Sequence, residues 1–193
     1  MITTEQIKDL RDKTGISIMQ CKKALEEVAG DMDKAIIVLS KQSAKIAEKK
    51  STRNLGSGII QSYIHTGGSA GAMVELLCET DFVAKNEEFK TLAYNLAMQV
   101  TATNPEFLNK EDISTEDRVK AEEVFKKEVD DKPAELQGKI LEGKLDAHFK
   151  DKILLEQAYI KDSNQNINGL IESAIQKFGE KIEVGQFVRL AIN

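Results

Sequence analysis

Apolar residues in the first fifty positions recur at helical spacing in three short runs, which are separated by turn residues. Thr3 and Gln6 match a capping box, and Ser17 and Gln20 match a second one, so two helices are predicted to begin at these positions. Asp31 is placed to cap a third helix. Because each apolar stripe is narrow, we expect the three helices to pack on one another as an N-terminal module.

The third run continues as a polar extension that leads into a linker at residues 51–57. The lysines of this extension are Lys41, Lys45, Lys49 and Lys50. A basic run of this kind is more often a solvated helix face than a phosphate-binding surface. The linker divides the chain into a three-helix module at residues 1–50 and a core at residues 58–193.

Beyond the linker the apolar period changes from helical to alternating, which is typical of β-strands. Gly67 and Gly68 mark a turn, so residues 58–78 are predicted to form an antiparallel hairpin. Residues 182–192 alternate in the same way and complete a small three-stranded antiparallel sheet, with Gly185 allowing a bulge. The alternating apolar residues of this last strand are Ile182, Val184, Val188, Leu190 and Ile192, interrupted on that face by Gln186.

The segment Thr80–Asn86 lies between the second strand and a strongly amphipathic helix, for which Asn86 is a good cap. The core stripe of that helix consists of Phe89, Leu92, Ala93, Leu96, Ala97 and Val100. Phe82 lies outside this stripe. It is either a residue that faces the core or an exposed aromatic plug, and periodicity does not distinguish these two interpretations.

Two charged helices follow within residues 112–150 and are predicted to form a protruding antiparallel helical hairpin. The segment Asp130–Pro133 separates them, with Pro133 as the first residue of the second helix. A further apolar stripe over residues 167–178 predicts a tail helix, which would cover the sheet together with the Phe89 helix. The predicted fold class is therefore α+β.

The composition argues against several classes of function. The chain has 27 Lys and Arg against 32 Asp and Glu, a formal net charge of −5, which argues against nucleic acid or an anionic membrane as the main partner. Two distant cysteines without metal-site spacing favour a reducing cytoplasm. No apolar run is long enough to span a bilayer.

Known catalytic constellations are missing from the sequence, which holds only two histidines. His65, at a strand end, is a candidate general base in a hydrolase, although a surface or partner-contacting histidine is the commoner case. We therefore expect a protein that acts by binding, without covalent chemistry.

Two motifs resemble the elongation factor Ts family. The first runs from Leu10 to Gly15 and continues with Met19 and the segment from Cys21 to Leu25; the second is Thr80–Asn86, which matches the family signature throughout. Two further segments, 140–145 and 154–157, resemble the family's hairpin region. The resemblance covers nearly the whole chain.

This resemblance implies a guanine-nucleotide exchange factor that promotes GDP release from elongation factor Tu, without a cofactor. It implies a ubiquitin-associated-like N-terminal module, with Phe82 as a wedge between helices of the GTPase and Asp81 disturbing its Mg²⁺ site. The positions expected to contact elongation factor Tu are Arg11, Thr14, Gly15, Ile18, Met19, His65, Thr80, Asp81, Phe82 and Val83. The alternative is a ribosome- or nucleic-acid-associated protein that uses the basic helix 41–53.

The chain departs from the family where Ile16, Ser17 and Gln20 replace the usual Ala, Gly and Asp, which affects contacts of the first module rather than its fold. Many members carry two related core subdomains, whereas this chain holds one. It therefore resembles the compact form of the family, which implies a homodimer. A small sheet with an open edge also favours a dimer with the sheet at its interface. The alternative is that a helix of the same chain covers the second face of the sheet.

Overall fold

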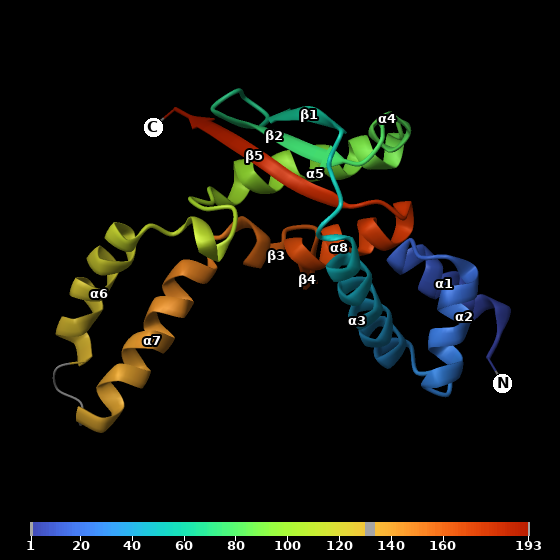
Figure 1. The fold of residues 1–193 in the computed structure, drawn as a ribbon, viewed down its shortest axis with the longest axis horizontal. Helices are drawn as coiled ribbons and strands as arrows, with labels where there is room; N and C mark the ends of the chain where they lie inside the picture. Colours follow the sequence, from blue (N-terminus) through green and yellow to red (C-terminus); the bar gives the residue numbers. More distant parts are fainter. Residues whose placement is uncertain (1, 130–133, 193) are drawn as a thin grey trace.

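The computed structural model describes residues 2–129 and 134–192, and over these residues the chain has the predicted α+β fold (Figure 1). The helices are α1 (Thr4–Thr14), α2 (Ile18–Glu27), α3 (Met32–Lys50), α4 (Asp81–Ala84), α5 (Glu87–Thr103), α6 (Thr115–Val129), α7 (Ala134–Lys150) and α8 (Ile167–Phe178), with the 3₁₀ turns η1 (Lys110–Asp112) and η2 (Leu154–Glu156). The strands are β1 (Ser57–Ile64), β2 (Ala70–Cys78), β3 (Ala158–Tyr159), β4 (Asp162–Asn166) and β5 (Ile182–Ala191).

Side-chain caps begin all three helices of the N-terminal module. Thr3 and Gln6 form the predicted reciprocal capping box. The Ser17 hydroxyl accepts a hydrogen bond from the Gln20 N–H at 3.4 Å and donates to the Gln20 side chain at 2.9 Å. Asp31 caps α3 as predicted. The three helices share one buried cluster, which consists of Leu10, Ile16, Cys21, Ala24, Leu25, Ala35 and Leu39.

Helix α3 belongs to both the module and the core. Its first half packs in the module cluster through Leu39, whereas Ile46 and Ala47 pack against the core. The Ser43 hydroxyl hydrogen-bonds Gln176 of α8, and Lys50 Nζ donates to the Gly179 carbonyl at 2.7 Å. The helix is therefore a continuous connection that fixes the module against α8.

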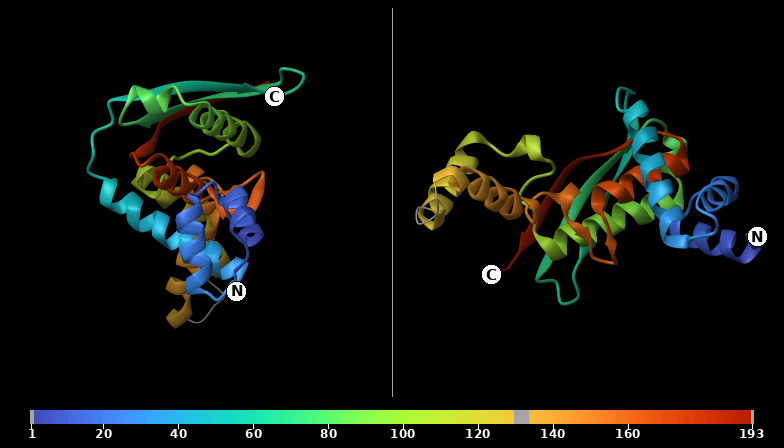
Figure 2. Two further views of the ribbon diagram at one scale, coloured as in Figure 1. Left: turned by 90° about the vertical axis from the view of Figure 1, so that its right-hand side faces the viewer. Right: turned by 90° about the horizontal axis from the view of Figure 1, so that it is seen from below.

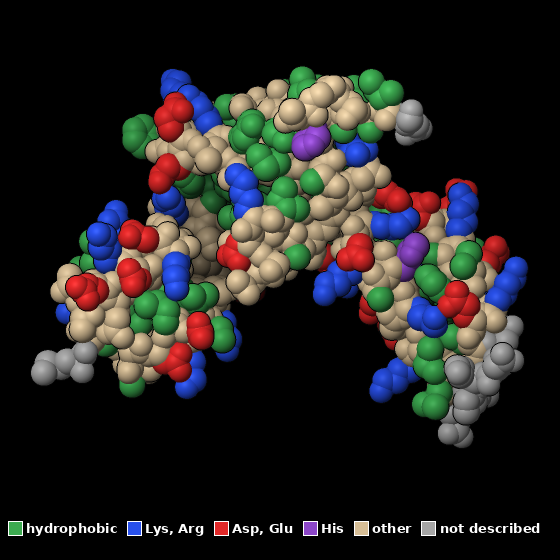
Figure 3. Space-filling view, turned by 180° about the vertical axis from the view of Figure 1, so that it is seen from behind, with side chains coloured by type: hydrophobic (Ala, Val, Ile, Leu, Met, Phe, Trp, Pro, Cys, Tyr) green, Lys and Arg blue, Asp and Glu red, His purple; other side chains and the backbone are tan. Residues whose placement is uncertain are grey.

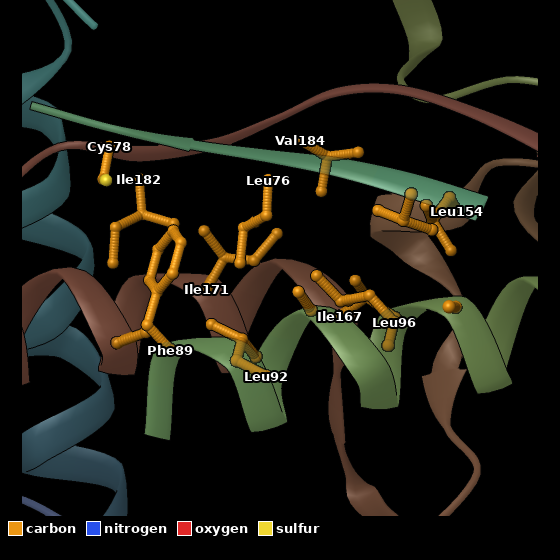
Figure 4. Packing of buried hydrophobic residues seen from close by; sticks show 14 of the residues in the cluster. Leu76, Cys78, Phe89, Leu92, Leu96, Leu154, Ile167, Ile171, Ile182 and Val184 are labelled. Carbon is orange, nitrogen blue, oxygen red and sulfur yellow. The ribbon is translucent and has the colours of Figure 1, made fainter. Parts of the chain in front are cut away.

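The sheet has the strand order β1-β2-β5, and both pairings are antiparallel (Figure 1). Helices α5 and α8 lie on one face, and no helix of the described residues covers the other face, which forms an outer layer (Figure 2, left). Apolar side chains of α5 and α8 meet the inner face of the sheet in the main core (Figure 4). All six residues of the predicted α5 stripe are buried, and so are Ala72, Val74, Leu76 and Cys78 of β2.

A β-bulge changes the face of the sheet on which the apolar side chains of β5 lie. The register between β2 and β5 shifts between Val74 and Leu76, next to Gly185. Before the shift, Val184 points into the core; after it, Val188 and Leu190 are exposed on the outer face. The predicted bulge is present, but the apolar residues of β5 are divided between the two faces, because one extra residue inverts a period-two pattern.

Helices α6 and α7 form the predicted hairpin, which projects from the core (Figure 1). Lys144 Nζ pairs with a Glu128 carboxylate oxygen at 2.6 Å across the two helices. A small buried cluster at the base of the hairpin contains Ala121, Leu145, Phe149 and Ile153. The expected turn at Asp130–Pro133 lies outside the described residues.

The short antiparallel pair β3-β4 has no counterpart in the sequence-based expectations. A buried glutamine holds this segment: Gln99 Nε2 donates to Gln157 Oε1 and to the Ala158 carbonyl, both at 3.1 Å. Gln99 Oε1 accepts from the Ile160 N–H at 2.9 Å. A fully buried amide needs such partners, so this segment is tied to α5.

Candidate partner-binding site

The motif Thr80–Asn86 forms the short helix α4 and its two caps, at the end of the sheet where β2 leaves it (Figure 1). Thr80 is the N-cap, and its side chain accepts from the Val83 N–H. Val83 and Ala84 are buried against the core and anchor the helix. Phe82 points away from them and is 80% exposed. Of the two interpretations of Phe82, the exposed aromatic residue is the correct one.

Asp81 occupies the first turn of α4, beside Phe82. Lys85 Nζ approaches its carboxylate at 2.6 Å, and both side chains are exposed. This hydrogen bond, with the charge of Lys85, lowers the pKa of the Asp81 carboxyl below its ordinary value. Asp81 is therefore a negative charge at neutral pH, directly beside an apolar ring.

The base of α4 is tied to the chain segment that joins α8 to β5. The Thr80 hydroxyl donates to Glu180 Oε1 at 2.6 Å, and the Thr80 N–H donates to Glu180 Oε2 at 3.0 Å. The neighbouring Glu79 accepts from the Lys181 N–H at 2.5 Å and pairs with Arg53 at 3.2 Å. The hydrogen bond from Lys181, followed by that from Arg53, lowers the pKa of Glu79.

The turn between α1 and α2 lies near the same end of the core. Thr14 and Gly15 line a groove of about 300 Å³ together with Glu88 of α5 and Lys177 of α8. Gly15 takes the left-handed conformation that ends α1. The Thr14 hydroxyl is turned inward and donates to the Leu10 carbonyl at 2.7 Å.

Three expected contact residues of this module are accessible. Met19 is 69% exposed and Ile18 is 57% exposed, both in the first turn of α2, and Arg11 is exposed near the end of α1. Large exposed apolar side chains close together are typical of interaction surfaces. The structure thus brings the α1–α2 turn and α4 to one end of the molecule (Figure 1).

His65 lies apart from these residues. It follows β1 at the hairpin turn, whereas Phe82 follows β2 at the opposite end of the same strands. Its Nδ1 is 3.1 Å from the Tyr63 hydroxyl, and its ring is exposed. The structure therefore does not group His65 with Thr80, Asp81, Phe82 and Val83.

Groups that could support covalent or metal chemistry are sparse in the described part of the chain. Within residues 2–129 and 134–192, no three His, Cys, Asp or Glu side chains are grouped to hold a metal ion. Cys21 and Cys78 are free thiols, both buried. No helix in this described part of the chain is long and apolar enough to cross a bilayer.

The kinds of exposed side chain differ between regions of the surface. Charged side chains of both signs cover the helical hairpin, whereas apolar side chains gather along the edge where the sheet lies (Figure 3). An exposed aromatic ring on a capped helix, near other exposed apolar side chains, is typical of surfaces that bind another protein.

The comparison with known proteins identifies the family. The family model described as elongation factor TS matches residues 5–193. Elongation factor Ts of Thermotoga maritima is 46% identical over 191 residues, which cover 99% of this chain and 96% of that protein. Elongation factor Ts of Thermodesulfovibrio yellowstonii is 46% identical over 192 residues (99% and 96%), and that of Desulforamulus reducens is 44% identical over 190 residues (97% and 88%). The chain belongs to the elongation factor Ts family, and it is a translation elongation factor of protein biosynthesis.

Phe89 of α5 and Phe82 of α4 separate a role in folding from a role at the surface. Phe89 is fully buried, so Phe89→Ala is expected to lower the free energy of unfolding by about 3–5 kcal/mol. Phe82 is 80% exposed, and Phe82→Ala is expected to change it by no more than about 0.5 kcal/mol. Denaturant titration measures both values, and equal losses would place Phe82 in the core.

Proposed function

We propose that this chain accelerates the release of GDP from elongation factor Tu. The observation that carries the proposal is the presentation of Phe82: a large apolar ring stands in solvent on a short helix that is capped and anchored at both ends. It lies within the segment that matches the family signature. Other exposed apolar side chains, Ile18 and Met19, lie at the same end of the molecule, and such a group of exposed apolar residues supports burial of the ring by a partner.

The physical basis is differential affinity. A ligand that binds the nucleotide-free GTPase more tightly than the GDP-bound form must weaken GDP binding by the same factor. Inserting Phe82 between helices of the GTPase domain would bury an aromatic side chain, which contributes about 1.5–3 kcal/mol. If that space opens only when the phosphate and Mg²⁺ site is disturbed, this free energy favours the nucleotide-free state.

Asp81 would act beside the ring. Its carboxylate is held ionised by Lys85 and stands next to Phe82. Placed near the Mg²⁺ site of the GTPase, a negative charge alters the groups that hold the metal and phosphates. We propose that this chain acts as an exchange factor that makes and breaks no covalent bond. We also propose that it acts in the cytoplasm.

The N-terminal module would supply a second contact. Ile18 and Met19 present an apolar edge near the α4 end, and Arg11 adds a cation beside it. Two contacts separated along one surface fix the orientation of the GTPase, so that Phe82 meets the same site in each encounter. We propose that this edge docks on the GTPase domain.

Release of a fluorescent GDP analogue from elongation factor Tu tests the function. The wild-type chain is expected to accelerate release, and Phe82→Ala to lower kcat/KM roughly ten- to hundredfold, because the buried ring is lost. Ile160→Ala removes another exposed apolar side chain, in the β3–β4 turn, and should match the wild type. A wild-type chain that leaves the rate unchanged would contradict the proposed function.

Met19→Asp tests the docking edge separately. Placing a charge in an apolar interface is expected to weaken binding to elongation factor Tu roughly tenfold or more, while the stability of the free chain is preserved, since Met19 is exposed. Ile160→Asp introduces the same group far from this edge as a control. Calorimetric titration against the GTPase gives the affinities, and an unchanged affinity for Met19→Asp would remove the module from the interface.

We also propose that the chain forms a homodimer through the outer face of its sheet. The half of this face next to the β1–β2 turn is apolar and exposed, and it forms a shallow groove of about 440 Å³. The residues of this outer face include Ser62, Ile64, Gly71, Met73, Val188, Leu190 and Ile192. No charged side chain is among the residues that line it.

The absence of charge along this groove favours a second copy as its occupant. When two identical copies of this uncharged groove pack together, no ion of its lining is left unpaired, whereas the charged surfaces of most proteins would leave some. A two-fold axis places the same patch on itself, and two three-stranded sheets packed face to face form a β-sandwich. Within the described residues, no helix of the same chain covers this face (Figure 2, left).

Two valines of β5 distinguish dimerisation from folding. Light scattering of the wild type at micromolar concentration is expected to give about twice the 21.4 kDa of one chain. Val188→Asp should yield a folded monomer, because its charge would be buried only in the dimer. Val184→Asp should unfold the chain, because Val184 faces the core and an uncompensated buried charge costs about 3–5 kcal/mol. A monomeric wild type that is active in exchange would refute the dimer.

A further inference from the structure

Helix α4 spans four residues, which is too short to be stable by its own backbone hydrogen bonds. An isolated segment of this length would not hold Phe82 in one direction. Its order must therefore come from the contacts at its ends. The C-terminal contact is the burial of Val83 and Ala84, and the N-terminal contact is made through Thr80.

Thr80 is held on several sides. Both Glu180 oxygens accept from it, one from its hydroxyl at 2.6 Å and one from its N–H at 3.0 Å. The Cys78 thiol donates to the Thr80 carbonyl at 3.2 Å, and the same carbonyl accepts from the Ala84 N–H at 3.2 Å. Because the hydroxyl hydrogen is directed to Glu180, a lone pair of that oxygen is left for the Val83 N–H.

Glu180 is the one partner of Thr80 in this set that comes from a distant part of the chain. It stands 100 residues further along, in the connection between α8 and β5. A second hydrogen bond joins the same two segments in the opposite direction: the Lys181 N–H donates to Glu79, and Arg53 of the linker also donates to Glu79. Glu79 precedes the cap and does not bond the helix, whereas Glu180 bonds the cap residue itself.

We propose that Glu180 is a positioning residue for nucleotide exchange: its carboxylate fixes the Thr80 cap and thereby the direction in which α4 presents Phe82. The inference rests on the proposed function for its kinetic consequence. Its structural part concerns the free chain alone. An aromatic side chain already held in the bound orientation loses less conformational entropy on binding, so exchange becomes faster.

The structural part is tested by amide hydrogen exchange in the full-length free chain carrying Glu180→Gln. The Ala84 and Lys85 N–H groups, which bond the Thr80 and Asp81 carbonyls, are expected to exchange roughly tenfold faster than in the wild type. Amides of α5 should keep their wild-type rates. Glu183→Gln removes a carboxylate three residues away, paired with Lys181, and is the matched control. Unchanged protection of Ala84 and Lys85 would overturn the inference, whatever the chain does to the GTPase.

The kinetic part uses GDP release from elongation factor Tu. Glu180→Gln is expected to lower kcat/KM roughly tenfold while the chain remains folded under the assay conditions, and Glu183→Gln to match the wild type. In a Phe82→Ala background, Glu180→Gln should cause a much smaller loss than in the wild type, because only Asp81 is left for α4 to position. Two losses that simply multiply would overturn the positioning role. A wild-type chain that does not accelerate release would refute the proposed function and leave the hydrogen-exchange result to decide whether Glu180 orders α4.

Discussion

The packing of α5 against the inner face of the three-stranded sheet is the contact on which the rest of the molecule depends. Phe89, Leu92 and Leu96 of this helix meet Leu76 of β2 and residues of β5 in the main core (Figure 4). Burial of side chains of this size contributes about 1.5–3 kcal/mol each, which fixes the direction of α5 relative to the sheet. The four residues of α4 must then bridge the end of β2 and the start of α5.

This constraint explains why Phe82 is exposed. The bridge has two residues, Val83 and Ala84, that reach the core, and with a helical repeat of 3.6 residues their neighbour Phe82 is turned outward. The same one-sided packing leaves the outer face of the sheet uncovered by any helix in the part of the chain that the structure describes. Both proposed interaction surfaces thus arise from one core: the α4 end for the GTPase and the outer sheet face for a second copy.

Much of the fold follows from local sequence. Helix caps, the glycine turn between β1 and β2, and the α5 stripe are short-range patterns, and each is present where the sequence predicts it. The face of β5 was not fully predictable, because the alternating pattern gives its apolar positions but not the inversion that a single extra residue causes. The pair β3-β4 was missed because its residues are polar and are held by Gln99, a distant and buried amide.

The part of the candidate site that depends on a short contiguous motif was likewise predictable from the sequence. The motif Thr80–Asn86 is contiguous, so its presence could be read directly, and the exposure of Phe82 needed the structure to be decided. Glu180 carried no local signal, since one glutamate after a helix C-cap is unremarkable and its partner Thr80 is 100 residues away. The expected contact residues come from three separate segments, and only the fold shows that two of them lie at one end of the sheet while His65 lies at the other.

The central claim is that this chain binds the nucleotide-free GTPase in preference to the GDP-bound form. Isothermal titration of the chain into elongation factor Tu, once stripped of nucleotide and once saturated with GDP and Mg²⁺, measures the two affinities directly. Binding to the nucleotide-free form is expected to be tighter by roughly 5–150-fold or more, the range typical of coupled sites. Equal affinities for the two forms would contradict it, because a ligand without differential affinity shifts no equilibrium.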